Sequence, residues 1–208
     1  MKALILANGR FPKTKKLKNE LKNASFLAVC DGAIKHIDSL GIIPNVIIGD
    51  LDSIDSKMKQ KYKDKLVHIK EQNSNDLSKA FFYCKKRGFD DFVILGATGK
   101  REDHTLANIS LLLYYSKFCK NVVIKSDYGE FRVYNLCKNK LIIDSQKGGQ
   151  ISIFCFDKTA KLDSKNLKYP LKNLSLENLS SGSLNEALSN NFSLKSSIEV
   201  QVIIYFSK

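Results

Sequence analysis

The chain has 208 residues, of which 43% are hydrophobic and 26% are charged. This composition is that of an ordinary globular protein and excludes a wholly disordered, collagen-like or disulfide-framework chain. The formal net charge is +13, with 34 Lys and Arg against 21 Asp and Glu. The lysines are scattered, so we interpret them as a solvated surface, with an anionic partner such as a polyphosphate as the alternative.

The cysteines and the N-terminus indicate the compartment. The five cysteines are an odd number without a CxxC pair, which favours buried free thiols in a reducing environment. The apolar run at the N-terminus is too short for a signal peptide. No segment approaches the roughly 18 apolar residues of a membrane span. We therefore expect a cytoplasmic protein without a membrane partner.

Short apolar runs alternate with helical patterns over residues 1–126. Runs typical of buried strands cover residues 3–7, 26–30, 46–48, 66–69, 92–95 and 122–125. Helical patterns cover residues 15–22, 33–40, 76–87 and 106–118. This alternation predicts βαβ units and a Rossmann-like, mainly parallel sheet with helices.

The pattern changes after about Ser126. Segments with β character and glycine-containing turns follow, without a long helical pattern, at residues 132–134, 140–144, 150–156 and 199–206. We predict a small all-β domain over residues 127–208, most simply a β-sandwich. The fold class is thus α/β plus all-β.

Polar loops follow four of the expected strands. They are Asp31-Gly32, residues 49–53, residues 72–76 and residues 96–104. Ligands of open α/β sheets bind at the carboxyl ends of the strands, which a parallel arrangement brings to one edge. The sequence therefore predicts a ligand site built from these loops.

Two carboxylates, Asp50 and Asp52, directly follow the expected strand 46–48. If extended geometry continues, both point to the same side, and a cation such as Mg²⁺ would relieve their repulsion. An Asx turn is the alternative. Asp76 could complete a metal site, or it could be a favourable charge at a helix N-terminus.

The loop at residues 96–104 is glycine-containing and basic. Lys100 and Arg101 could contact phosphate, although the spacing is not that of a Walker A loop. Asp103 is alternatively the N-cap of the next helix, and His104 a structural hydrogen-bonding residue. In the second part, the polar turn at residues 181–187 is either a ligand-binding edge or an ordinary loop.

Taken in order, these segments resemble the thiamine pyrophosphokinase family over nearly the whole chain. The matching pieces are Asp31-Gly32-Ala33, residues 44–54, residues 72–80, residues 96–108, residues 166–171 and residues 183–186. The chain departs from the family pattern by the absence of Trp and at Glu71, Asn75, Lys100 and Leu184.

The resemblance implies transfer of the β,γ-diphosphate of ATP to the hydroxyl of thiamine, releasing AMP, in a homodimer whose acceptor site lies between subunits. It implies Mg²⁺ held by Asp50, Asp52 and Asp76. Arg101 and Asp103 complete the implied catalytic set. The implied ATP-binding and phosphate-binding residues are Asp31, Gly32, Gln72, Lys79, Lys100, Arg101 and His104. The implied thiamine side holds Ser183 and Asn185.

Two other functions stay open at this point. A pyrophosphokinase of the same fold could act on another hydroxymethyl heterocycle such as a pterin, because Leu184 and the absent Trp alter the acceptor side. A non-enzymatic, basic nucleic-acid-binding protein would account for the net charge. Acidic residues at the strand ends argue against nucleic acid, so we expect no such partner.

Overall fold

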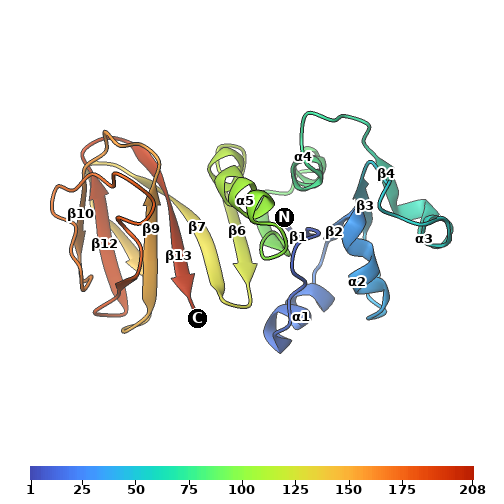
Figure 1. Ribbon diagram of the computed structural model, residues 1–208, viewed down its shortest axis with the longest axis horizontal. Helices are drawn as coiled ribbons and strands as arrows, with labels where there is room; N and C mark the ends of the chain where they lie inside the picture. The colour runs from blue at the N-terminus through green and yellow to red at the C-terminus, as the bar shows by residue number, and fades with distance from the viewer. The chain divides into compact units, whose positions relative to one another are not determined.

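The computed structural model describes residues 1–208, which form two compact units, Met1–Asp127 and Tyr128–Lys208. The first unit alternates strands with helices, and the second is built of strands without a helix (Figure 1). No helix is both long and apolar enough to cross a membrane.

The first unit contains a six-stranded sheet in which every pairing is parallel, in the order β6-β5-β1-β2-β3-β4. Its central strands are buried on both faces, which explains their continuous apolar runs. The predicted parallel sheet is confirmed. The strands are β1 (Lys2–Leu6), β2 (Leu27–Cys30), β3 (Val46–Gly49), β4 (Leu66–His68), β5 (Asp91–Leu95) and β6 (Asn121–Ser126).

Helices cover both faces of this sheet (Figure 1). Leu17 and Leu21 of α1 pack with Ile34 and Ile37 of α2 in one core cluster. On the other face, α4 contacts β1, β2 and β3, and α5 contacts β6. The helices are α1 (Lys15–Lys22), α2 (Ile34–Asp38), α3 (Ser56–Lys61), α4 (Asp76–Lys86) and α5 (Glu102–Tyr115), with short 3₁₀ turns at Asp31–Ala33 and Lys63–Lys65.

The second unit is a sandwich of antiparallel strands, as predicted. One layer has the order β11-β9-β13-β7 and the other β10-β12-β8. A single apolar cluster, with Phe192 and Ile204 among its fully buried members, takes side chains from both layers. The strands are β7 (Gly129–Leu136), β8 (Leu141–Asp144), β9 (Gln150–Cys155), β10 (Leu162–Lys165), β11 (Asn185–Glu186), β12 (Asn191–Ser196) and β13 (Val200–Ser207).

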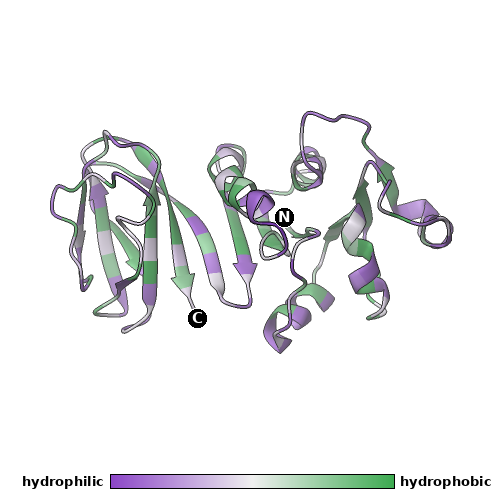
Figure 2. Cartoon of the chain, in the orientation of Figure 1, coloured by the Kyte–Doolittle hydropathy of each residue, from purple (hydrophilic) through white to green (hydrophobic).

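Several elements differ from the sequence-based expectation. Helix α5 begins at Glu102 rather than at residue 106, because the acidic residues 102 and 103 suit the first turn of a helix. Helix α3 was not predicted, since it buries no side chain and its polar sequence has no apolar stripe (Figure 2). The strands β10, β11 and β12 were also not predicted.

All five cysteines are free thiols, as expected. Cys30, Cys84 and Cys155 are buried, whereas Cys119 and Cys137 are partly exposed. Burial raises the pKa of the Cys84 thiol to about 12, so this thiol stays protonated and packs as a small apolar group.

A candidate active site at the strand ends of the first unit

A pocket of about 290 Å³ lies at the carboxyl ends of β1, β2 and β5, against the first turns of α4 and α5. This is the edge at which the sequence predicted a ligand site. Both polar side chains and backbone line it. The lining residues are Ala7, Asn8, Gly9, Cys30, Asn75, Asp76, Leu77, Ala97, Thr98, Lys100, Arg101, His104, Thr105 and Asn108.

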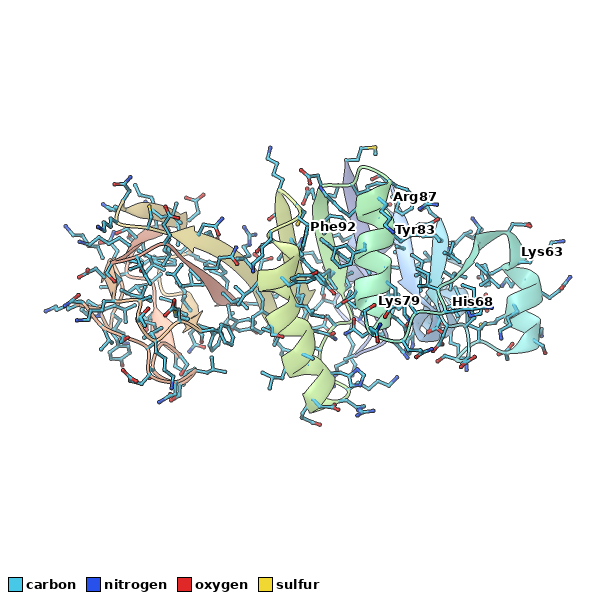
Figure 3. All side chains as sticks on the ribbon, turned by 90° about the horizontal axis from the view of Figure 1, so that it is seen from above. Lys63, His68, Lys79, Tyr83, Arg87 and Phe92 are labelled. Carbon is cyan, nitrogen blue, oxygen red and sulfur yellow. The ribbon has the colours of Figure 1, made fainter.

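The first turn of α4 carries the acidic group of the pocket. Asn75 caps the helix by accepting a hydrogen bond from the Ser78 N–H at 2.9 Å, and Asp76 is the first helical residue. The predicted place of Asp76 at a helix N-terminus is therefore confirmed. Its carboxylate accepts from the Lys79 ammonium at 3.2 Å, and the Lys79 side chain is only 4% exposed. Figure 3 shows Lys79, Tyr83 and Arg87 in order along α4.

Asp31 directly follows β2 and is buried. It contacts the loop after β3, which carries Asp50 and Asp52. Its two carboxylate oxygens accept from the backbone N–H groups of Gly32 at 2.5 Å and Leu51 at 3.0 Å. Burial raises the pKa of Asp31, and the negative charges of Asp76 and Asp50 raise it further. Asp31 therefore lies close enough to Asp76 and to Asp50 to be affected by the charge of each.

The loop after β3 does not continue as a strand. Leu51 has φ of +66°, a left-handed conformation, and the Asp52 N–H donates to the Asp50 carboxylate at 3.1 Å. The expectation of extended geometry through Asp52 is therefore wrong, and the Asx-turn alternative is confirmed. Asp31 accepts a hydrogen bond from the Leu51 N–H in the middle of this turn. This bond holds the turn in place and with it Asp50, the first residue of the turn.

The glycine-containing loop after β5 is fastened to the segment after β1. The Gly9 N–H donates to the Gly96 carbonyl at 2.6 Å, and the Arg10 N–H donates to the Thr98 carbonyl at 2.8 Å. A Cβ on Gly9 would stand 2.3 Å from the Gly96 oxygen, so only glycine permits this close approach. The Lys100 ammonium lies 3.4 Å from two oxygens of Asn8.

The basic side chains of this loop face solvent. Arg101 is the residue before α5 and forms an ion pair with Asp103. The Arg101 guanidinium lowers the pKa of the Asp103 carboxyl. Asp103 lies inside the first turn of α5, so its predicted role as the N-cap is wrong. Lys100, Arg101 and His104 all line the pocket.

The structure brings some predicted residues together and leaves others apart. Of the residues predicted in this unit, the pocket is lined by Asp76, Lys100, Arg101 and His104. Behind it, Gly32 packs so closely on the Asn8 side chain that a Cβ would lie 2.2 Å from Nδ2. Gln72 is exposed and does not line the pocket.

Sequence reasoning missed three asparagines of the pocket, Asn8, Asn75 and Asn108. Asn8 and Gly9 follow the first strand directly, so the same strand-end rule could have identified them. Asn75 lies in the expected polar loop 72–76 and Asn108 ends the matching piece 96–108, so both stood in segments already singled out, although neither had been assigned a role.

A protein-only metal cage is absent: no group of three His, Cys, Asp or Glu side chains is arranged to hold a metal ion. Mg²⁺, however, is commonly bound by one or two carboxylates together with waters and substrate phosphates. Asp76, which lines the pocket, fits that second arrangement, whereas Asp50 lies outside the pocket lining.

In the second unit, the predicted turn uses its polar groups internally. Asn185 is 4% exposed, accepts from the backbone N–H groups of Tyr169 and Glu186, and donates to the Tyr169 carbonyl at 2.7 Å. Ser183 donates to the Ser180 carbonyl at 2.8 Å. Between them, Leu184 is 75% exposed with φ of +55°. Contact of Ser183 and Asn185 with thiamine stays a prediction.

Comparison with known proteins gives one family for both units. The family model described as "Thiamin pyrophosphokinase, catalytic domain" matches residues 17–124, and "Thiamin pyrophosphokinase, substrate-binding domain" matches residues 133–205. A relative named "Thiamin pyrophosphokinase 1" from Caenorhabditis elegans is 30% identical over 177 residues, covering 77% of this chain and 70% of its own length.

Solved structures show the same fold. The crystal structure of thiamine pyrophosphokinase from Bacillus subtilis superposes with a TM-score of 0.81 at 22% identity, covering 100% of this chain and 99% of its own. The thiamin pyrophosphokinase of Candida albicans superposes with a TM-score of 0.82 at 18% identity, covering 99% of this chain and 89% of its own. The motifs, the fold and the two family models agree, and the chain belongs to the thiamine pyrophosphokinase family of enzymes.

Proposed function

We propose that this member of the family binds ATP at the strand-end pocket and transfers its terminal diphosphate to the hydroxyl of thiamine, giving thiamine diphosphate and AMP. The observation that carries the proposal is the pocket itself, in which Asp76 lies together with Lys100, Arg101 and His104. An anionic substrate that carries a divalent cation needs both kinds of charge in one place.

In the reaction, the thiamine hydroxyl oxygen forms a bond to the β-phosphorus of ATP. The bond between that phosphorus and the oxygen bridging to the α-phosphate breaks, the hydroxyl loses its proton, and AMP leaves with the bridging oxygen. The residues of the chain contribute mainly by holding the reacting groups in line and by offsetting charge on the phosphate oxygens.

Mg²⁺ is the cofactor that this chemistry needs. Asp50 and Asp76 would hold it with phosphate oxygens and water, and Asp52 would contribute from the same loop. Bound there, the ion would neutralise charge on the diphosphate. Asp31, whose oxygens are occupied by backbone N–H groups, would instead hold the loop that carries Asp50.

The phosphate contacts belong to the loop after β5. Lys100 and Arg101 are exposed at the pocket, and the Arg101 fork could exchange its Asp103 partner for a phosphate. Lys79 is buried and paired with Asp76, which supports a role in holding that carboxylate. Asp103 would then be released to accept a hydrogen bond from the substrate hydroxyl.

The second unit would supply the thiamine side, since its model carries the description of a substrate-binding domain. We assign Ser183 and Asn185 to that side, with Asn185 acting through the backbone that it holds. We also propose that the protein is a homodimer and that it works in the cytoplasm.

The test incubates purified protein with ATP, Mg²⁺ and thiamine and resolves nucleotides and thiamine species by chromatography. We expect AMP and thiamine diphosphate in equal amounts, and none of either with EDTA. ADP with thiamine monophosphate would contradict diphosphate transfer. Turnover with a hydroxymethylpterin but not with thiamine would contradict the acceptor. Gel filtration in the same buffer would test the dimer.

A further inference from the structure

Two asparagine amides form a chain of hydrogen bonds across the back of the pocket. The Asn75 Nδ2 donates to the Asn108 Oδ1 at 3.1 Å, and the Asn108 Nδ2 donates to the Ala97 carbonyl at 2.8 Å. At the other end, the Asn75 Oδ1 accepts the Ser78 N–H at 2.9 Å. The chain therefore runs from the first turn of α4, through α5, to the loop after β5.

The orientation of both amides is fixed by this chain. The Ala97 carbonyl can only accept, so the group of Asn108 that faces it must be the NH₂. The Oδ1 of Asn108 then faces Asn75 and needs a donor, which is the Asn75 NH₂. The Asn75 Oδ1 is left for the Ser78 N–H, a donor. Every bond in the chain thus agrees with one arrangement.

This chain of hydrogen bonds joins the acidic and the basic side of the pocket. Asn75 immediately precedes Asp76, and Ala97 opens the loop that carries Lys100 and Arg101. Asn108 is 8% exposed, so water cannot readily replace its partners. Shifting α4 relative to the loop would break one of these buried bonds.

We propose that Asn75 and Asn108 are positioning residues that set the separation between Asp76 and the phosphate-binding loop. This inference rests on the proposed function, in which one ATP molecule meets the metal carboxylates and the basic loop together. A displacement of about 1 Å at a reacting centre can cost on the order of a hundredfold in rate. A fixed separation between these two sides therefore accounts for the hydrogen bond between the buried Asn108 and the partly buried Asn75.

The variant that isolates the link is Asn75→Thr. A threonine hydroxyl can still cap α4 by accepting the Ser78 N–H, but it sits one bond closer to the backbone than the Asn75 Nδ2 and so does not reach the Asn108 Oδ1. We expect kcat to fall about tenfold, within the range that misplacement produces. The KM for thiamine should stay within about twofold, because the acceptor side is assigned to the second unit, and the melting temperature should change little.

A further variant separates the link from the helix cap. Asn75→Ala removes both the bond to Asn108 and the cap of α4, so kcat should fall by the same factor as in Asn75→Thr and the melting temperature should be lower. Asn121→Thr makes the matched change at an exposed amide that pairs with Asp91 on β5, and it should leave kcat unchanged. If Asn75 and Asn108 act as one link, Asn75→Thr combined with Asn108→Ala should be no slower than Asn108→Ala alone.

A second readout does not depend on turnover. Freed from the link, the loop should open more often, so the amides of Gly99 and Arg10 should exchange hydrogen at least severalfold faster in Asn75→Thr. An inactive wild-type enzyme with this faster exchange would refute the proposed function and leave the link standing. Unchanged exchange, or an active wild type matched by Asn75→Thr, would overturn the link.

Discussion

The two units use polar side chains in opposite ways. In Met1–Asp127, polar side chains near the strand ends, among them Asp76, Lys100 and Arg101, line an open pocket. In Tyr128–Lys208, Asn185 in the polar turn at residues 181–187 is buried, and its amide forms hydrogen bonds with the backbone of Tyr169 and Glu186. Similar residue types thus line an open pocket in one unit and hold the backbone in the other.

This difference shows that the type of a residue in a family motif does not by itself say whether the residue serves binding or stability. A carboxylate such as Asp50 accepts a hydrogen bond in its own turn, yet its negative charge also raises the pKa of the buried Asp31, a cost that the turn by itself does not require. An asparagine such as Asn185, whose amide oxygen and nitrogen both have backbone partners, needs no ligand to account for it. Substitutions should therefore affect turnover in the first unit and stability in the second.

The largest effect should come from Asp50→Asn. Removing one negative charge that would hold Mg²⁺ against the diphosphate should lower kcat by about a hundredfold or more. The side chain can still accept the Asp52 N–H, so the turn and the circular dichroism spectrum should be retained. A folded variant with near-normal AMP release would show that Asp50 is not needed for turnover, which would contradict the contrast between the two units.

A smaller fall in turnover should follow Gly49→Ala. The added Cβ would stand 2.6 Å from the Asp31 Cγ, so the carboxylate that braces Leu51 must move. We expect kcat to drop roughly tenfold, as for a modest misplacement of the loop. Steady-state kinetics at saturating thiamine measure this. Gly41→Ala places a strained alanine at φ +66° with no atom within 4 Å of the new Cβ, so it is a control for a destabilising glycine substitution outside the site, and its kcat should stay unchanged.

In the second unit, Asn185→Ala should act on stability. It leaves the buried N–H groups of Tyr169 and Glu186 without their acceptor, which should cost about 1–3 kcal/mol of unfolding free energy. Urea titration measures the loss. Ser183→Ala removes an exposed hydroxyl bond and should cost less than about 1 kcal/mol. If Asn185→Ala instead kept its stability and lost thiamine affinity, the division between the units would fail.

The smallest effect should come from Asp38→Asn, the matched carboxylate of the first unit outside the pocket. Hydrogen bonds from Lys61 and Tyr62 lower the pKa of Asp38. Its contribution to stability is therefore present at neutral pH and is lost as the pH falls through that lowered pKa. The urea midpoints of wild type and variant should differ slightly at pH 7 and converge in acid, with kcat unchanged. A loss of turnover would show that charge alone, wherever it lies, drives the Asp50 effect.

Much of the fold followed from the sequence. Buried parallel strands give uninterrupted apolar runs, which is why residues 3–7 and 92–95 were predictable. Helix α3 and the two-residue strand β11 escaped prediction, because one buries nothing and the other is too short to show a pattern. The edge at which the pocket lies was also predictable, from the rule for open α/β sheets.

The sequence by itself determined the fold class, the family and the charged residues of the strand-end loops, because these depend on local pattern and on ordered motifs. Only the tertiary structure decided what each side chain does. It buried Lys79 against Asp76, turned Asp31 toward backbone N–H groups, and joined Asn75 to Asn108 across 33 positions of the chain. Hydrogen bonding and burial depend on neighbours that are distant in sequence, so no local pattern contains them.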